Sequence, residues 1–271
     1  MTTDTISAFN NPDAINEAVA QATAEPSKET RDILTLNPPD TLVDLPGGYM
    51  SLTGEVYTTA EVRELTGKDE EAIARTTSLA RAMNTVLLKG TVSVGDEPAT
   101  EKVLDNMLSG DRDTLLLGIY KATFGPTAEL PTFCDGCREI KTVAIEIDTD
   151  IKVKKLEDPI GDRNFTVETR KGEVDVTLPT GVTQRELLSS TDKSSAELAS
   201  ILLQNTVTSI NGTPVYNKNQ VLNLGIADRR KIGDEIAKRN PGPQLQDVTV
   251  ECPDCGGDVT VPVNFGTLFR F

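Results

Sequence analysis

The chain has 271 residues, with 27 basic and 42 acidic side chains, no histidine and a formal net charge of −15 at pH 7. The absence of histidine excludes Ser-His-Asp catalysis, Cys-His catalysis and every His-ligated metal site, and the acidic balance argues against a nucleic-acid partner because phosphates would be repelled. No apolar run approaches the ~20 residues that span a bilayer, and nothing resembles a signal peptide, so we expect a soluble protein made in a reducing cytosol, without membrane insertion.

The first 42 residues are polar and rich in Asn, Thr and Glu. We predict an extended or flexible N-terminal arm over residues 1–42, in which Asp13 would cap a short helix over residues 14–22. Too few apolar side chains are present to offset the ordering entropy of a packed element. Two interpretations stay open: an arm that becomes ordered on a partner, and a tail without function.

From Val43 onward, similar segments recur in the same order, and we predict an internal duplication. The spacing between matched segments grows from 114 residues to 118, as single-residue insertions would produce. The matches pair Thr66-Gly67 with Thr180-Gly181, Leu87-Leu88 with Leu202-Leu203, Pro98 with Pro214, Asp111-Arg112 with Asp228-Arg229, and Cys134-x-x-Cys137 with Cys252-x-x-Cys255. The predicted repeats cover residues 43–150 and 151–271, with residues 151–163 as the boundary.

Each repeat is predicted as an α+β unit of strands, two helices and a cysteine knuckle followed by one strand. In the first repeat we expect a strand segment over residues 55–65 and helices over 69–87 and 99–122, the latter broken near Ser109-Gly110. In the second we expect strands over 165–168 and 173–178 and helices over 183–188, 196–204 and 218–238, the last broken near Gly225. Gly95-Asp96 and Asn211-Gly212 are predicted tight turns, and Asp111 and Asp228 are predicted helix N-caps.

All four cysteines fall in the two knuckles. Strand-like residues follow each pair, whereas a redox dithiol needs a helix N-terminus, and structural disulfides are disfavoured in a reducing compartment. Two thiolate pairs on tight turns fit one closed, zinc-ribbon-like Zn²⁺ site that has a structural role. Free buried thiols and a redox or disulfide pair remain the alternatives. The predicted zinc ligands are Cys134, Cys137, Cys252 and Cys255.

We find no candidate catalytic group. Asp69, Glu70 and Glu71 are interpreted as the acidic first turn of a helix, and Asp111-Arg112-Asp113 as a cap with surface ion pairs. We therefore predict that the protein is not an enzyme, and an enzyme that uses carboxylates alone is the weakest alternative.

The C-terminal segment holds three of the seven phenylalanines, beside the second knuckle. One interpretation packs the segment on the ribbon as core, and the other makes it an apolar docking site for another subunit. The candidate partner-binding residues are Phe265, Leu268, Phe269 and Phe271.

Several motifs together resemble a known family. They are Asp44-Leu45-Pro46-Gly47-Gly48, the segment from Val62 to Glu71, Ser109-Gly110-Asp111-Arg112-Asp113, the two knuckles, Asn240-Pro241-Gly242-Pro243 and the phenylalanine-rich end. In this combination the chain resembles the T-even-type baseplate hub assembly proteins, or hub assembly chaperones, of contractile-tailed phages. The resemblance covers residues 43–271 and offers no catalytic residue.

The resemblance implies a non-enzymatic tail protein that assembles or forms the baseplate hub, where tail tube, tape measure and spike meet. Its partners would be other tail and hub proteins, and its locations the virion tail baseplate and, during assembly, the host cytoplasm. Self-association into a homo-oligomer is left open. The alternative is a host-directed or regulatory binding module that zinc stabilises.

Overall fold

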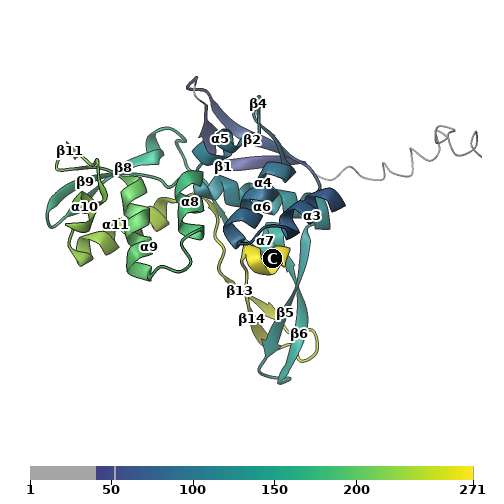
Figure 1. The fold of residues 1–271 in the computed structure, drawn as a ribbon. Helices are drawn as coiled ribbons and strands as arrows, with labels where there is room; N and C mark the ends of the chain where they lie inside the picture. The colour runs from purple at the N-terminus through teal and green to yellow at the C-terminus, as the bar shows by residue number, and fades with distance from the viewer. Residues whose placement is uncertain (1–40, 52, 271) are drawn as a thin grey trace, which may run out of the picture. The chain divides into compact units, whose positions relative to one another are not determined.

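The computed structural model describes residues 41–51 and 53–270, and the fold is α+β with several small antiparallel sheets (Figure 1). The predicted α+β class is therefore confirmed. Residues 1–40 of the predicted arm, with the helix expected after Asp13, lie outside the described residues, and Leu42 at the end of the arm already begins a strand. No helix among the described residues combines the length and the apolar character needed to cross a membrane.

The first half of the described chain is a four-stranded sheet with four helices. The sheet has the order β1-β2-β3-β4, two helices lie between β2 and β3 in the sequence, and two more follow β4. The strands are β1 (Leu42–Met50), β2 (Val56–Val62), β3 (Thr91–Val94) and β4 (Glu97–Pro98), and the helices are α3 (Gly67–Ala74), α4 (Leu79–Gly90), α5 (Glu101–Asn106) and α6 (Ser109–Phe124). The predicted break near Ser109-Gly110 is confirmed as the boundary between α5 and α6.

The single helix predicted over residues 69–87 is wrong, because two helices, α3 and α4, occupy this segment. The Thr76 hydroxyl donates to the Ile73 carbonyl at the end of α3, and the Ser78 hydroxyl accepts from the Arg81 amide at the start of α4. Side chains of Thr and Ser that bond the backbone in this way compete with a continuous helix. The predicted acidic helix start is confirmed, since Asp69 and Glu70 lie in the first turn of α3.

The second half repeats the order of strands and helices. Its sheet has the order β8-β9-β10-β11, with two helices between β9 and β10 and two after β11. The strands are β8 (Asn164–Thr169), β9 (Gly172–Thr177), β10 (Val207–Ile210) and β11 (Thr213–Pro214), and the helices are α8 (Gly181–Leu188), α9 (Ser195–Thr206), α10 (Lys218–Leu222) and α11 (Ile226–Arg239). The predicted break near Gly225 is confirmed. Both predicted tight turns are also confirmed, since Gly95-Asp96 connects β3 to β4 and Asn211-Gly212 connects β10 to β11.

The N-cap predictions for Asp111 and Asp228 are wrong. The N-caps of α6 and α11 are Leu108 and Gly225, and each aspartate lies at the third helical position. Each carboxylate instead accepts a hydrogen bond from the backbone of its own half. Asp111 accepts from the Gly47 amide of β1 at 2.7 Å, and Asp228 accepts from the Arg170 amide, in the turn after β8, at 3.0 Å. These bonds tie the start of each helix to the neighbouring sheet.

Two connecting segments run between the halves. The outgoing segment holds α7 (Ile147–Asp150), β7 (Val153–Lys154) and the short 3₁₀ helix η2 (Gly161–Arg163), and the returning segment holds β12 (Gly242–Pro243). Strands β7 and β12 pair antiparallel. The two connections are therefore joined to each other by backbone hydrogen bonds.

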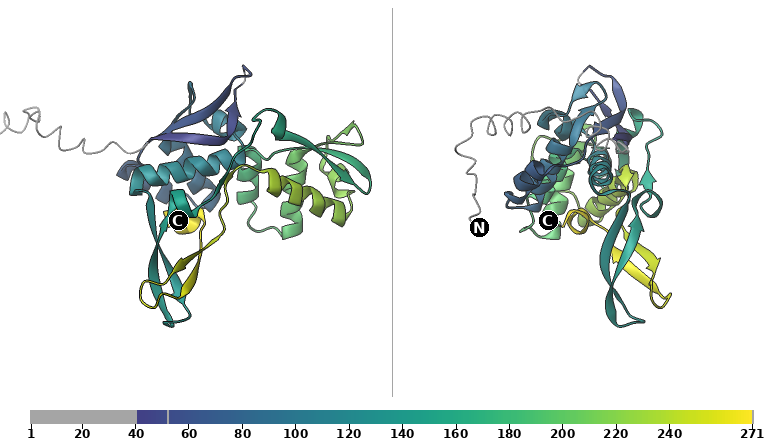
Figure 2. Two further views of the ribbon diagram at one scale, coloured as in Figure 1. Left: turned by 180° about the vertical axis from the view of Figure 1, so that it is seen from behind. Right: turned by 90° about the vertical axis from the view of Figure 1, so that its right-hand side faces the viewer.

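Each half ends in a β-hairpin, and the two hairpins lie side by side (Figure 2). The first hairpin is β5 (Thr127–Cys134) with β6 (Glu139–Glu146), and the second is β13 (Asp247–Glu251) with β14 (Asp258–Pro262), followed by α12 (Phe265–Phe269). The Thr132 hydroxyl of β5 donates to the Thr260 carbonyl of β14 at 2.9 Å. Side chains of the second hairpin and of α12 belong to the same apolar core as the first half, whereas β8–β10 and α9–α11 enclose a separate, smaller core.

Candidate metal centre

The four cysteines lie at the tips of the two hairpins. Cys134 is the last residue of β5 and Cys137 precedes β6, while Cys252 follows β13 and Cys255 precedes β14. The strand predicted after each knuckle is therefore present, and it pairs with a strand before the knuckle that was not predicted. In the first tip, Arg138 has a positive φ of 58° and its amide donates to the Cys134 carbonyl, which closes the turn.

The four sulfur atoms form a tight cluster, with all Sγ positions within 4.8 Å of one another. Cys134 Sγ lies 3.6 Å from Cys255 Sγ, and Cys137 Sγ lies 3.8 Å from Cys252 Sγ. A tetrahedral zinc site with Zn–S bonds of about 2.3 Å has sulfur–sulfur edges of about 3.8 Å. The spacing therefore suits four thiolates around one zinc ion, and each hairpin supplies two of them.

The geometry argues against the two alternatives with bonded or reactive thiols. All four cysteines are free, and the two sulfur separations are far longer than the roughly 2.05 Å of a disulfide bond. The CxxC pairs stand at strand ends, so no helix N-terminus of the described chain activates a thiolate there.

Backbone amides point at the sulfur atoms. The Cys137 amide donates to Cys134 Sγ at 3.4 Å, and the amides of Cys255 and Asp254 lower the pKa of Cys252 to about 7. Hydrogen bonding with the Cys255 sulfur raises the pKa of Cys137 to about 12, and burial and the other two sulfur atoms act in the same direction. Four thiolates at this spacing would repel one another, so they need a cation between them.

A salt bridge beside the cluster links the two hairpins. Lys141 Nζ of β6 lies 2.6 Å from Asp254 in the second knuckle and 2.7 Å from Glu139. These two carboxylates hold the pKa of Lys141 above its usual range. The ammonium group therefore stays charged beside a cluster whose four thiolates would be net negative even with Zn²⁺ bound.

The predicted partner-binding residues lie largely in the interior. Phe265 and Leu268 of α12 are buried, and the Phe269 ring packs edge-on against Tyr120 at 5.6 Å between centroids. Phe271 lies outside the described residues. This placement accords with the core interpretation of the segment, and the partner-binding role remains a prediction.

Sequence reasoning missed a buried polar cluster between the halves and wrongly placed Arg112 on the surface. Arg112 is 2% exposed, and its guanidinium donates to Gln184 of α8, to the Leu104 carbonyl and to Asn84. Burial raises the pKa of Asp111 to about 6 and that of Asp113 to about 7. The available signal was the Asp-Arg dipeptide, which occurs at the same position of α6 and α11.

Comparison with known proteins gives one result. A family model described as T4 bacteriophage base plate protein matches residues 41–270. No match was found among curated proteins or among solved structures.

Proposed function

Because the chain belongs to the T4 bacteriophage base plate protein family, we propose that it is a non-enzymatic component of the baseplate hub, acting where tail tube, tape measure and spike meet. The observation that carries this proposal is the extent of the family match, which spans every described residue. Membership of the family implies a component of the phage baseplate, and the position in the hub is our proposal.

The match runs from residue 41 to residue 270, so it takes in both halves and both cysteine knuckles. A function that depends on the whole folded unit, such as a place in a subunit assembly, fits this extent better than a function confined to one loop or pocket. The acidic balance of the chain, with a net charge of −15, favours basic partners and limits non-specific association.

The motifs that carry the hub resemblance support a structural role. Three of them meet between the halves: the Gly47 amide donates to Asp111, and the Ser109 hydroxyl donates to the Asn240 side chain at 3.3 Å. Arg163 of η2 donates to the carbonyls of Gly47 and its neighbour in β1. The residues of these three motifs therefore help to hold the halves together.

We also propose that the four cysteines bind one structural Zn²⁺. Four thiolates leave no open coordination position, so the ion would staple the hairpins and supply no Lewis-acid chemistry. The test is the metal content of purified protein, with one zinc per chain expected. Cys252→Ser should lose the ion, whereas Asp135→Ser, at an exposed position of the other knuckle, should keep it. Parent protein purified without zinc from zinc-supplemented medium would overturn the proposal.

We further propose that the halves are two copies of one ancestral unit. The matching order of strands and helices supports this, as do the Thr66 and Thr180 N-caps that begin α3 and α8. The division into repeats over residues 43–150 and 151–271, preceded by an arm, belongs to the same proposal.

Quantitative mass spectrometry of phage particles and of assembly intermediates tests the hub role. A few copies per finished particle, cross-linked to tube, tape-measure or spike proteins, are expected of a hub component. Presence in intermediates alone would make the protein an assembly chaperone of the hub. Absence from both would overturn the hub proposal and favour the host-directed module.

A further inference from the structure

The start of α8 packs on a specific surface of the first half. We call this surface, the start of α6 over residues 108–112, the first junction. Leu108 forms an isolated antiparallel bridge with Thr180, and two further backbone bonds flank it, from the Ser109 amide to the Pro179 carbonyl and from the Gly181 amide to the Met107 carbonyl, both at 2.9 Å.

Side chains extend this contact. Arg112 Nε donates to Gln184 Oε1 at 2.9 Å, and Gln184 Nε2 donates to Asp113 at 2.6 Å. Arg185 of α8 pairs with Glu101 of α5, also at 2.9 Å. The second half therefore contacts the first half through the start of α8 and through a few polar side-chain pairs.

The proposed duplication matches each segment of one half with a segment of the other. Under this matching, the two surfaces of the contact, the first junction and the start of α8, each have a counterpart elsewhere in the chain. The start of α11 over residues 225–229, which we call the second junction, matches the first junction at an offset of 117 residues. The start of α3 matches the start of α8 at an offset of 114 residues, N-cap threonine on N-cap threonine.

These two counterparts are open where the originals are covered. Leu108, Ser109 and Gly110 are buried, whereas Gly225, Ile226 and Ala227 are exposed, with Ile226 at 73%.

The helix starts show the same contrast. A Cβ built on Gly181 would meet the Leu104 carbonyl, whereas a Cβ on Gly67 would meet nothing within 4 Å. In the chain, the first junction and the start of α8 are therefore in contact, and we call this the filled contact. The second junction and the start of α3 are the two surfaces of an equivalent contact that is not formed.

The charges at the open parts are complementary. The counterparts of Gln184 and Arg185 are Glu70 and Glu71, both exposed on α3. The counterparts of Glu101, Arg112 and Asp113 are Lys218, Arg229 and Arg230. The Arg185–Glu101 pair thus recurs as Glu71 and Lys218, with both signs reversed.

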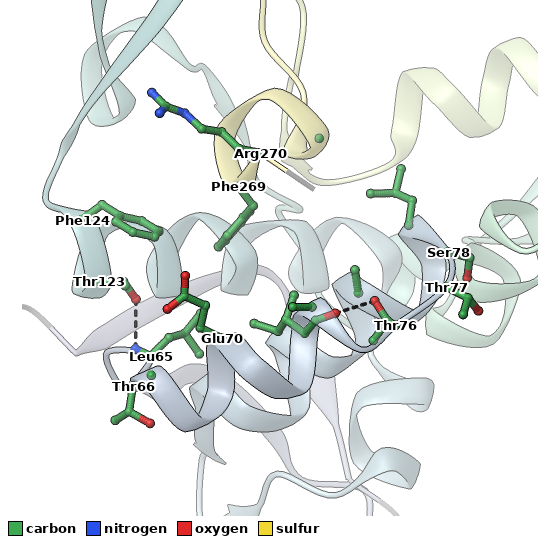
Figure 3. A pocket seen from close by; sticks show the side chains of 16 residues that line it. Leu65, Thr66, Glu70, Thr76, Thr77, Ser78, Thr123, Phe124, Phe269 and Arg270 are labelled. Atoms are coloured by element: carbon green, nitrogen blue, oxygen red, sulfur yellow. Dashed lines mark hydrogen bonds between the residues drawn. The ribbon is translucent and has the colours of Figure 1, made fainter.

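A cavity of about 760 Å³ lies beside the open helix start (Figure 3). Gly67, Glu70 and Ala74 line its α3 side, and Phe124 and Phe269 line it opposite. Those three α3 positions correspond to Gly181, Gln184 and Leu188, which face the first half in the filled contact. The face of α3 that corresponds to the covered face of α8 therefore borders a partly apolar cavity.

We propose that a second copy of this chain fills this contact, with the start of α3 in one chain docked on the second junction of the next. Thr66 would lie beside Gly225, and Glu70 and Glu71 would face Arg230 and Lys218. Ile226, exposed in the single chain, would be covered. The interface joins two different surfaces, so the chains assemble head to tail, into a ring if the rotation closes and into a filament if it does not.

Charge reversal on each side tests the proposal without disturbing the core. The full chain should self-associate in analytical ultracentrifugation at about 0.15 M salt. Glu71→Lys and Lys218→Glu should each weaken self-association roughly tenfold or more, because like charges would then face each other. Glu129→Lys, at an exposed position of β5, makes the same charge change away from both surfaces and should have no effect.

Mixing the Glu71→Lys and Lys218→Glu variants is the decisive measurement. The new positive charge on α3 of one variant then faces the new negative charge on α10 of the other, so the equimolar mixture should regain the assembly that each variant alone has lost. A parent chain that stays monomeric at all concentrations would overturn the proposal. So would assembly that neither reversal weakens, or a mixture that does not recover.

Discussion

The two halves have the same order of elements and yet bury them very differently. In α6 of the first half, 11 of 16 residues are buried, including the charged Asp111 and Arg112, whereas in α11 only 3 of 14 are buried. The difference arises from neighbours, since α6 lies against elements of both halves, whereas the main contacts of α11 are with α9 and β8 of its own half. The same local pattern can thus form a central helix or an edge helix.

The neighbours that cover the first half come from the second. The α8 start, β12 and the second hairpin all pack on first-half elements, and Val261, Phe265 and Leu268 belong to the first-half core. The second half contributes these segments to its neighbour and keeps a small core of its own. Stability is therefore expected to be unequal between the halves.

Removal of the proposed zinc ion should have the largest effect and should reveal the greatest difference in stability between the halves. Structural zinc contributes on the order of 10 kcal/mol in finger peptides, so we expect Cys252→Ser or chelation to expose both hairpins and loosen the first core. Hydrogen exchange should rise in β5, β6, β13 and β14, while β9 and α11 stay protected. Equal loss of protection in both halves would contradict this unequal dependence, and Asp135→Ser supplies the control.

Truncation of matched core residues compares the cores directly. Leu115 and Ile232 occupy equivalent positions in α6 and α11, and both are fully buried. Each change to alanine should lower the free energy of unfolding by about 2–5 kcal/mol, with the larger loss for Leu115→Ala because its core is larger. Urea denaturation measures both, and a larger loss for Ile232→Ala would reverse the ranking of the two cores.

A glycine at the first junction offers a sharper contrast. A Cβ on Gly110 would overlap the Pro241 carbonyl oxygen, whereas the equivalent position already holds the exposed Ala227. Gly110→Ala should destabilise the protein by about 1–3 kcal/mol through overpacking. The matched control, Ala227→Gly, should cost no more than about 1 kcal/mol in thermal or urea unfolding. Similar losses for the two variants would show that the contact between the halves tolerates an added methyl group.

The last prediction concerns pH and the carboxyl groups of Asp111 and Asp113. A carboxyl whose pKa is raised on folding holds its proton more tightly in the folded state, so its destabilising effect is full above about pH 7 and disappears below the unfolded pKa of about 3.9. Stability should therefore gain from Asp111 as the pH falls from about 7 to about 4. Asp111→Asn should remove this contribution to the pH dependence of the unfolding free energy, which is less than about 1.4 kcal/mol per pH unit.

The measurement is the difference in unfolding free energy between the parent and Asp111→Asn across about pH 4–8, which cancels the other titrating groups. The raised pKa follows from burial, and among the described residues Oδ2 of Asp111 has no hydrogen-bond partner. A difference that does not change with pH would show that Asp111 titrates alike in the folded and unfolded chain.

Sequence reasoning predicted the elements that depend on local patterns and missed those that depend on distant ones. The α+β class and the helix breaks near Ser109 and Gly225 could be predicted from periodicity and glycine placement, and the clustering of the four cysteines from their two CxxC pairs. Strand β1 was not predicted, because Pro46, Gly47 and Gly48 are unfavourable within a strand. In the structure the pairing register of β1 shifts at these residues, and the Gly47 amide donates to the Asp111 carboxylate.

The hairpins around the cysteines were likewise only half predicted. A strand after each knuckle follows from the alternating valines and isoleucines, but the strand before the first knuckle contains Pro131 and pairs with β6 over its full length. The buried Arg112 was missed for a related reason, because its partners Asn84 and Gln184 come from separate segments of the sequence.

The joining of the two hairpins also sets an order of events during synthesis. The chain leaves the ribosome with the first half leading, yet that half needs Cys252, Val261 and Leu268, which follow the helices and sheet of the second half. The first-half core cannot close around these late residues until translation has passed them. A chain that stops before Cys252 would keep an open first-half core and two thiols without their partners, so the first half completes its fold only after the second half has been synthesised.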